Sequence, residues 1–158
     1  MLPTILQAAQ LLKNKYGEEV QFVLPIASSL TESDLYPYLK QSHLHINLVK
    51  NNTYDLINTC DAIIAVSGTV TLEIALLAKP MVIIYKMAAF NFFFIKRLIK
   101  IPFIGLCNIV AQEKIIQELI QDQATATNIS NEISHILDDK IYRETMIEKL
   151  SKIRTQLN

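Results

Sequence analysis

The chain has 158 residues, of which 51% are hydrophobic and 19% charged, so it is too apolar to be a disordered tail and long enough to bury a core. Fifteen basic residues balance fifteen acidic ones, which excludes a nucleic-acid-binding protein held by a large positive net charge. The balance conceals a gradient, because residues 1–73, 74–112 and 113–158 carry net charges of −3, +5 and −2.

The lengths of the apolar runs and the placement of the cysteines exclude further classes. The longest uncharged runs, such as residues 101–112, are shorter than the roughly 18 to 20 apolar residues of a membrane-spanning helix, so no transmembrane helix is predicted. The first residues lack the basic region of a signal peptide. Cys60 and Cys107 lack the short spacing of metal ligands, so we expect buried thiols in a cytoplasmic protein.

The first 85 residues alternate between amphipathic helices and short apolar strands. Helices are predicted over residues 2–12, 31–41, 54–58 and 69–78. Strands are predicted over residues 20–24, 45–49, 62–66 and 81–85. Strands this short and apolar, separated by helices, are typical of a parallel sheet whose two faces are covered by helices.

After residue 85 the pattern becomes mostly helical. Helices are predicted over residues 88–100, 113–120, 128–137 and 141–157. The two candidate linkers, residues 28–33 and 122–127, are too short to separate two full domains. The expectation is one α/β domain over residues 1–158, with a Rossmann-like parallel sheet and a helical C-terminal part.

The most informative stretch is the turn after the strand predicted over residues 62–66. Ser67 and Gly68 form the turn, and Thr69 begins a helix that carries Glu73 four residues later, on the same face. Ligands of open parallel sheets bind at such turns, where free N–H groups and the helix dipole favour a diphosphate. Glu73 would suit sugar hydroxyls instead, because a carboxylate only accepts hydrogen bonds. The alternative is an ordinary capping turn with Ser67 or Thr69 as N-cap.

This turn and its continuation carry a family resemblance. The sequence SGTVTLEIALLAKPMVIIYKM is followed by FNFFFIKRLIKIPFIGLCNIVAQ and then by EKIIQELIQ. These segments contain five blocks whose order and spacing resemble the C-terminal half of the lipid A disaccharide synthase family, most clearly from Asp61 to Gln121. That family has a Ser-Gly-Thr-x-x-Leu-Glu turn, a Pro-Met-Val-x-x-Tyr block, an aromatic and basic helix, a Pro-Asn-Leu loop and a Glu-Leu-Leu-Gln helix.

The resemblance implies a GT-B glycosyltransferase, in which two Rossmann-like halves face each other across a cleft. The C-terminal half binds UDP-2,3-diacylglucosamine, whose sugar is transferred to 2,3-diacylglucosamine 1-phosphate to give lipid A disaccharide 1-phosphate and UDP. It implies no metal and no cofactor besides this donor, in agreement with the lack of a DxD motif in the sequence. The general base is expected in the acceptor-binding N-terminal half, which these residues do not match, so no catalytic residue is assigned.

Carried over position by position, the resemblance assigns five donor-binding residues: Ser67, Gly68, Thr69, Glu73 and Asn108. An Asn amide donates and accepts at once, which suits a nucleotide, although a loop asparagine in a local turn is the alternative for Asn108. The sequence departs from the family pattern around this loop. Cys107 stands where proline is usual, and Gln112-Glu113 replaces Gly-Arg.

The helix predicted over residues 88–100 combines apolar and basic side chains. It has too many apolar residues for one core-facing stripe, and its cations cluster at the C-terminal end. It is either a buried helix whose basic residues complement the helix dipole or a surface that contacts lipid. Because both implied substrates are acylated, the resemblance favours a lipid-contacting patch made of Phe90, Phe92, Phe93, Phe94, Lys96, Arg97 and Lys100.

The implied setting is the cytoplasmic face of the inner membrane, with peripheral association and no nucleic-acid partner. A separate chain carrying the acceptor half would complete the cleft, and self-association through the exposed face of the domain is the other expected partner interaction. Two other functions remain open. One is a non-catalytic UDP-sugar-binding module, and the other is a different GT-B N-acetylglucosaminyl transferase.

Overall fold

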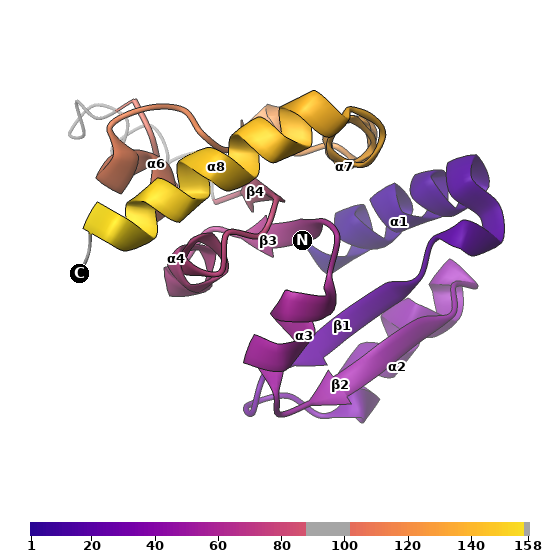
Figure 1. Cartoon of the computed structure of the whole chain (residues 1–158). Coiled ribbons are helices and arrows are strands. Elements are labelled where there is room, and N and C mark those ends of the chain that lie inside the picture. The colour runs from indigo at the N-terminus through magenta and orange to yellow at the C-terminus, as the bar shows by residue number, and fades with distance from the viewer. Residues whose placement is uncertain (88–101, 157–158) are drawn as a thin grey trace.

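The computed structural model describes residues 1–87 and 102–156 and shows an α/β protein with parallel strands (Figure 1). One sheet pairs β1 (Phe22–Ile26) with β2 (Ile46–Lys50), and the other has the order β3 (Ile63–Val66), β4 (Met81–Tyr85), β5 (Glu118–Ile120). All strand pairs are parallel. The predicted α/β class is therefore confirmed, with the parallel strands divided between two small sheets.

Helices surround both sheets and form the C-terminal part of the chain (Figure 1). Their starts follow local rules: Thr31 and Asp34 form a capping box at one helix, and the Thr125 side chain caps another. The α-helices of the described residues are α1 (Leu2–Tyr16), α2 (Glu32–Ser42), α3 (Thr53–Thr59), α4 (Thr69–Leu76), α6 (Leu106–Ala111), α7 (Ala126–Asp138) and α8 (Lys140–Gln156).

The prediction of a helix over residues 113–120 is wrong. The end of this segment is the strand β5, which pairs with Ile83–Tyr85 of β4. The backbone N–H of Ile83 also donates to the carbonyl of Gln117, at 3.0 Å. Ile116, Glu118 and Leu119 are all buried, so the segment lies inside the protein and completes a ladder instead of presenting one apolar helix face. The short helix α6 occupies the part of the chain expected to be a loop.

The core is centred on β4, in which the side chains from Met81 to Ile84 are at most 1% exposed. Burial on both faces explains why this strand is continuously apolar. The helices α4, α7 and α8 bury apolar side chains around it, and α1 adds Ala8 and Leu12 to the same cluster. Phe22 of β1 packs against this cluster, so the two sheets share a core although they are not hydrogen-bonded to each other.

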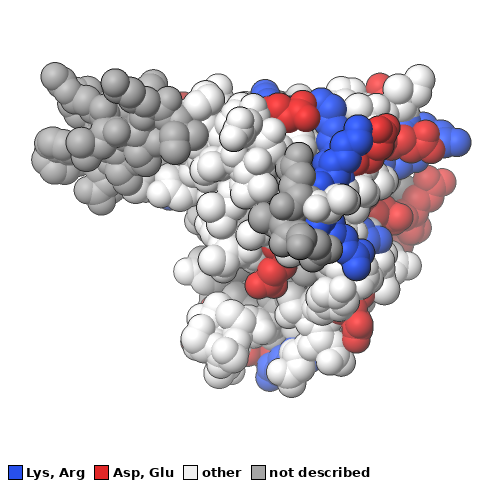
Figure 2. All heavy atoms as spheres, turned by 60° about the vertical axis from the view of Figure 1, so that its left-hand side comes forward, with Lys and Arg blue, Asp and Glu red and all other residues white. Residues whose placement is uncertain are grey.

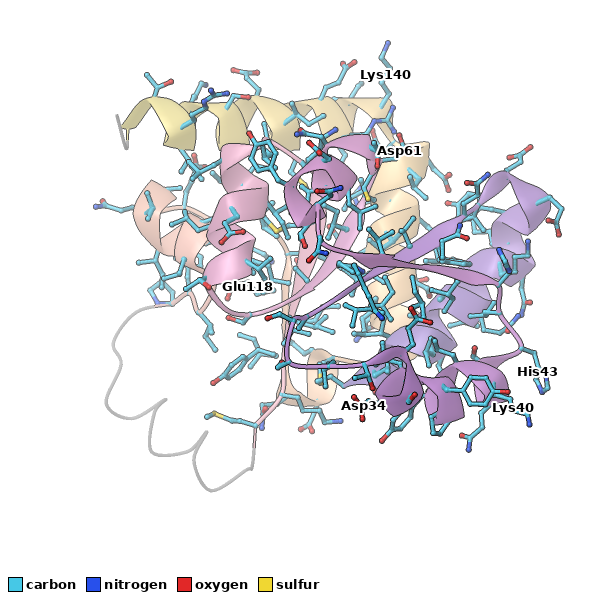
Figure 3. All side chains as sticks on the ribbon, turned by 90° about the horizontal axis from the view of Figure 1, so that it is seen from below. Asp34, Lys40, His43, Asp61, Glu118 and Lys140 are labelled. Atoms are coloured by element: carbon cyan, nitrogen blue, oxygen red, sulfur yellow. The ribbon has the colours of Figure 1, made fainter. Side chains whose placement is uncertain are left out.

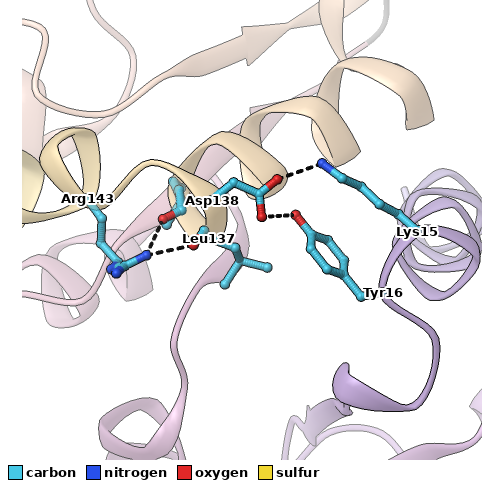
Figure 4. Close-up of polar contacts among 6 residues, drawn as sticks. Lys15, Tyr16, Leu137, Asp138 and Arg143 are labelled. Atoms are coloured by element: carbon cyan, nitrogen blue, oxygen red, sulfur yellow. Dashed lines mark hydrogen bonds and ion pairs between the residues drawn. The ribbon is translucent and has the colours of Figure 1, made fainter.

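Polar contacts join the ends of α1, α7 and α8 (Figure 4). The carboxylate of Asp138 accepts hydrogen bonds from Lys15 Nζ at 2.7 Å and from Tyr16 Oη at 2.8 Å. The guanidinium of Arg143 donates to the carbonyls of Ile136 and Leu137, at 2.9 and 2.8 Å. These bonds satisfy carbonyls at the end of α7 that have no partner within the helix, and they hold α7 against its two neighbours.

The Asp138 contact is expected to make stability depend on pH. The hydrogen bonds from Lys15 and then Tyr16 lower the pKa of the Asp138 carboxyl below its usual value. A lowered folded-state pKa stabilises the protein above the unfolded-state pKa of about 4, and this contribution is lost as the pH falls through the folded-state value. Asp138→Asn should therefore lower the urea midpoint at neutral pH, and the difference from wild type should shrink in acid.

The check is urea unfolding of wild type and Asp138→Asn at neutral pH and well below the carboxyl pKa. Lys15→Met removes the cation that pairs with Asp138. Its difference in urea midpoint from wild type should likewise shrink in acid. A difference between wild type and Asp138→Asn that stays constant across this pH range would contradict the role of the contact.

The predicted basic middle of the chain is only partly described. Lys79 donates to the carbonyl of Asn58 at 2.6 Å, so it joins the segment after α4 to the end of α3. Lys86 is exposed. The helix expected over residues 88–100 and its predicted lipid patch (Phe90, Phe92, Phe93, Phe94, Lys96, Arg97 and Lys100) lie outside the described residues. Figure 2 shows charged side chains gathered on one part of the visible face and a mostly uncharged surface elsewhere.

Within residues 1–87 and 102–156, no helix is both long enough and apolar enough to cross a lipid bilayer.

Candidate functional site

The turn between β3 and α4 stands at the carboxyl end of the parallel ladder. The backbone N–H of Ser67 donates to the carbonyl of Ile84 at 2.9 Å, so the ladder continues to the first residue of the turn. Gly68 is the N-cap, and its carbonyl accepts from the Thr71 hydroxyl at 2.7 Å and from the Thr71 N–H at 3.1 Å. A buried threonine inside the helix therefore holds the turn.

The hydroxyl groups of Ser67 and Thr69 do not serve as helix caps. Among residues 1–87 and 102–156 no side chain caps the N-terminus of α4, and the first turn of this helix contains no acidic residue. The N–H groups and the positive end of the helix dipole are thus not neutralised by a neighbouring carboxylate of the helix. The N-cap of α4 is therefore Gly68, and not Ser67 or Thr69 as the capping-turn alternative had it.

Four of the five predicted donor-binding residues come together at this turn. Gly68, Thr69 and Glu73 are exposed and Ser67 is half-buried, whereas Thr71, Ile74 and Ala75 of the same helix are buried. Gly68 has an extended backbone, and an added Cβ would meet only the carbonyl oxygen of Val66, at 4.0 Å. Neither the backbone conformation nor the packing therefore requires glycine at position 68.

Asn108 does not join these residues at the surface. It is fully buried, and its Nδ2 donates to the Ile116 carbonyl and to Glu118 Oε1, both at 2.8 Å. Its Oδ1 accepts from the N–H groups of Ile115 and Ile116, both at 2.9 Å. Both donors and both acceptor positions of the amide are used within the protein. The prediction that the Asn108 side chain contacts the donor nucleotide is therefore corrected: its role is structural.

Glu118, which is labelled in Figure 3, accepts hydrogen bonds from the segment that contains Asn108. Glu118 is only 8% exposed. Its carboxylate nevertheless accepts three hydrogen bonds: from the N–H of Ile104 at 2.8 Å, from the N–H of Gly105 at 2.9 Å and from Asn108 Nδ2. A Cβ on Gly105 would lie 2.9 Å from Glu118 Oε1 and 2.7 Å from Ile83 Cδ1. A larger residue at position 105 would thus force the Ile83 or Glu118 side chain to shift.

Sequence reasoning missed the role of Glu118. The available signal was a single acid between apolar residues in the stretch IIQELI, which is unusual for a buried strand unless the carboxylate has partners. Gln121 follows it and holds the chain after β4: its Oε1 accepts from the Met87 N–H at 2.7 Å and its Nε2 donates to the Met87 carbonyl at 2.9 Å. Glu118 and Gln121 together thus fix residues 87 and 104–105.

Two departures from the family pattern have plain structural outcomes. Cys107 is fully buried, and this burial raises the pKa of its thiol to about 11, so at neutral pH the reactive thiolate is scarce. Glu113 is exposed and pairs with Lys149 of α8 at 2.7 Å. The negative charge of Glu113 is therefore paired with a cation on α8 in a surface ion pair.

The fold and this turn define a class of protein. Parallel strands connected by helices, with an exposed strand–turn–helix junction at the carboxyl end of a ladder, are the features of a Rossmann-like α/β protein.

Comparison with known proteins then specifies the family. The lipid-A-disaccharide synthetase family matches residues 1–158, and the chain belongs to this family. It is similar to lipid-A-disaccharide synthases from Geobacter metallireducens and Geobacter sulfurreducens, at 47% and 48% identity over 157 residues, and from Coxiella burnetii, at 40% identity over 158 residues. These alignments cover 99–100% of the chain but only 41% of each relative, so the chain spans about two fifths of their length.

Proposed function

We propose that residues 1–158 are one domain, the donor-binding half of a GT-B lipid A disaccharide synthase. In the proposed reaction a hydroxyl of 2,3-diacylglucosamine 1-phosphate attacks the anomeric carbon of UDP-2,3-diacylglucosamine. The bond between that carbon and the diphosphate breaks, and UDP leaves. The observation that carries the proposal is the exposed, uncapped Ser67-Gly68-Thr69 turn in a chain whose full length matches the family.

The residues of the turn have separate roles in this proposal. The diphosphate would lie over Gly68, where backbone N–H groups at the start of α4 and the hydroxyls of Ser67 and Thr69 donate hydrogen bonds to it. The same donors stabilise the negative charge that develops on departing UDP. Glu73, one turn further along α4, would accept hydrogen bonds from sugar hydroxyls.

Asn108 and Glu118 support this site without contacting the donor. Helix α4 packs against α6, and α6 is anchored through the Asn108–Glu118 hydrogen bond at 2.8 Å. Their contribution to transfer is to hold the surface beside α4 in one conformation, which preserves the geometry of a bound donor.

The acylated substrates place the proposed reaction at the cytoplasmic face of the inner membrane. In this proposal the phenylalanines of residues 88–100 would contact acyl chains and the cations of the same segment would contact phosphates. The acceptor half would be supplied by further polypeptide or by a second chain, because a cleft between two halves positions the acceptor hydroxyl and its general base.

Titration of UDP into the purified chain tests the donor site. Three variants each change one feature at an exposed position. Gly68→Ala prevents close approach of a ligand to the backbone, Thr69→Val removes a hydroxyl, and Glu73→Gln removes a carboxylate. Each variant should keep the wild-type urea midpoint, since exposed substitutions change stability little. Gly68→Ala and Thr69→Val should weaken UDP binding about tenfold, equivalent to ~1.4 kcal/mol. Glu73→Gln should act mainly on the sugar-containing donor.

The matched control is Glu19→Ala, because Glu19 is exposed and lies outside α4. It should leave both the UDP affinity and the urea midpoint unchanged. No measurable UDP binding by the wild-type chain would defeat the proposed function. Wild-type UDP affinity in both Gly68→Ala and Thr69→Val would defeat the assignment of the site.

A second function is favoured by one observation, namely that the chain spans only 41% of its relatives. Such a chain alone would be a UDP-sugar-binding module that transfers nothing. UDP titration does not distinguish this module from half of a working synthase, but a transferase assay does.

A further inference from the structure

Within the residues that the structure describes, each of the two sheets has an edge without a hydrogen-bonded neighbour. There, β1 pairs only with β2, and β3 pairs only with β4. In β3, the N–H of Ile63 donates to the Pro80 carbonyl at 3.0 Å and that of Ser67 donates to the Ile84 carbonyl at 2.9 Å. Because backbone groups of successive strand residues point to opposite sides, Ile64 and Val66 direct their N–H and C=O groups to the unpaired edge.

The connections between elements indicate what is absent from that edge. The helices α2, α3 and α4 each lead from one parallel strand to the next. α1 likewise leads into β1 and buries Leu6, Ala9 and Leu12, so it has the position and the packing of a crossover helix. Parallel neighbours are joined by a helix in this way, and a crossover helix before β1 calls for a strand before α1.

The order of the strands locates this additional strand. The usual doubly wound sheet has the order 3-2-1-4-5-6. With an additional first strand, the strands of this chain follow that order: β2 and β1 on one side, β3, β4 and β5 on the other, and the additional strand between β1 and β3. The same placement explains why two sheets with one shared core lack a common ladder.

We propose that one parallel strand from polypeptide outside these 158 residues binds between β1 and β3 and joins the two sheets into one. Its chemistry follows from the site. It should be four to five residues long, as β3 and β1 are, and apolar, because helices cover both faces of a doubly wound sheet. Val23 and Val66, on the two strands that it would join, are 37% and 42% exposed and would become covered.

The source of the strand is the sequence that precedes the matched region in the longer relatives, since a crossover helix follows its strand directly. The bound strand would end beside Ser67 and Gly68, at the carboxyl end of β3, so strand binding would also shape the proposed donor site. The inference rests on strand pairing and family membership and does not depend on UDP binding. Pro25, next to the end of β1, has no N–H to give, so β3 is the better strand to test.

The test uses a synthetic peptide with the roughly twenty residues that precede the matched region in the Geobacter sulfurreducens relative, a length that includes one short strand and its flanks. The peptide should bind the purified chain with one-to-one stoichiometry and raise its melting temperature. It should also slow hydrogen exchange of the Ile64 and Val66 amides, which face the unpaired edge. A scrambled peptide of the same composition should do neither.

Two modifications separate edge pairing from other modes of binding. Val66→Pro removes an edge N–H while leaving those of Ile63 and Ser67, and should weaken peptide binding about tenfold or more, whereas Val66→Thr should stay within about twofold. Because Val66→Pro also strains the strand, the second modification is made on the ligand. Peptides N-methylated at alternate residues, tested on the wild-type chain, should lose binding in one of the two alternation patterns.

Equal binding of the scrambled peptide, or unchanged exchange at Ile64 and Val66, would overturn the inference. So would a dimer in which those same amides are protected without any peptide, because a second copy would then occupy the edge. Peptide binding without UDP binding would sustain the inference and defeat the proposed function, and the reverse result would do the opposite.

Discussion

Glu118→Ala is expected to lower the free energy of unfolding by about 3–5 kcal/mol, because it leaves three donors without their acceptor, at roughly 1–3 kcal/mol for each buried donor. The donors are the N–H groups of Ile104 and Gly105 and the amide of Asn108. A loss of this size is a large part of the total stability of about 5–15 kcal/mol that is ordinary for a domain. Glu118→Gln keeps the shape of the side chain but turns an NH₂ group toward an N–H donor, so a smaller loss is expected.

Urea unfolding followed by circular dichroism measures these differences. Glu19→Ala is the control, because an exposed glutamate outside such a network should change stability by less than about 0.5 kcal/mol. Asn108→Ala and the double variant complete a cycle. Their effects should not be additive, since Asn108 and Glu118 share one hydrogen bond at 2.8 Å. A loss below about 1 kcal/mol in Glu118→Ala would show that water or a rearranged loop satisfies the three donors.

A polypeptide of these 158 residues alone is expected to form lipid A disaccharide 1-phosphate more slowly than a full-length relative by a factor on the order of 10⁵. The proposed donor residues lie on one exposed turn, and nothing opposite this turn in the described residues holds an acceptor hydroxyl. Positioning of two reactants supplies rate factors of this order, and that contribution is lost when one wall of the cleft is missing.

The assay supplies both acylated substrates in detergent micelles and follows the disaccharide product. The Geobacter sulfurreducens relative serves as the positive control, and the Gly68→Ala variant of the 158-residue chain reports whether any product that this chain forms depends on the donor turn. Product formation at a rate near that of the relative would contradict the expectation. Rates restored by mixing in the missing half as a separate chain would support a synthase over a non-catalytic module.

The elements of the first 85 residues were predicted from the sequence to within a few residues. The expected strand 81–85 coincides with Met81–Tyr85, and the expected helix 31–41 is displaced by one residue from Glu32–Ser42. These elements carry their own signals, because apolar periodicity, capping residues and glycine or proline breaks lie within the elements or beside them. The Ser67-Gly68-Thr69 turn was predicted for the same reason, since it lies between a clear strand and a clear helix.

Prediction failed in the segment from residue 104 to residue 120, where structure depends on partners further along the chain. The sequence around Asn108 does not show that its amide is used by Ile115, Ile116 and Glu118. Helix propensity favoured a helix over residues 113–120, but the free edge of β4 accepts this segment as a strand. Pairing of distant backbone groups outweighs a local preference of a few tenths of a kcal/mol per residue, about the spread of the helix scale.

By itself, the sequence determined the alternation of helices and strands, the exposed turn after β3 and the family resemblance, because these depend on residues that are neighbours in the chain. The tertiary structure alone decided that Asn108 faces inward, that Glu118 holds the segment around it, and that the strands form two ladders instead of one. The reason is physical: a buried polar group or a strand edge is stable only with its partner, and the partner is chosen by the folded arrangement.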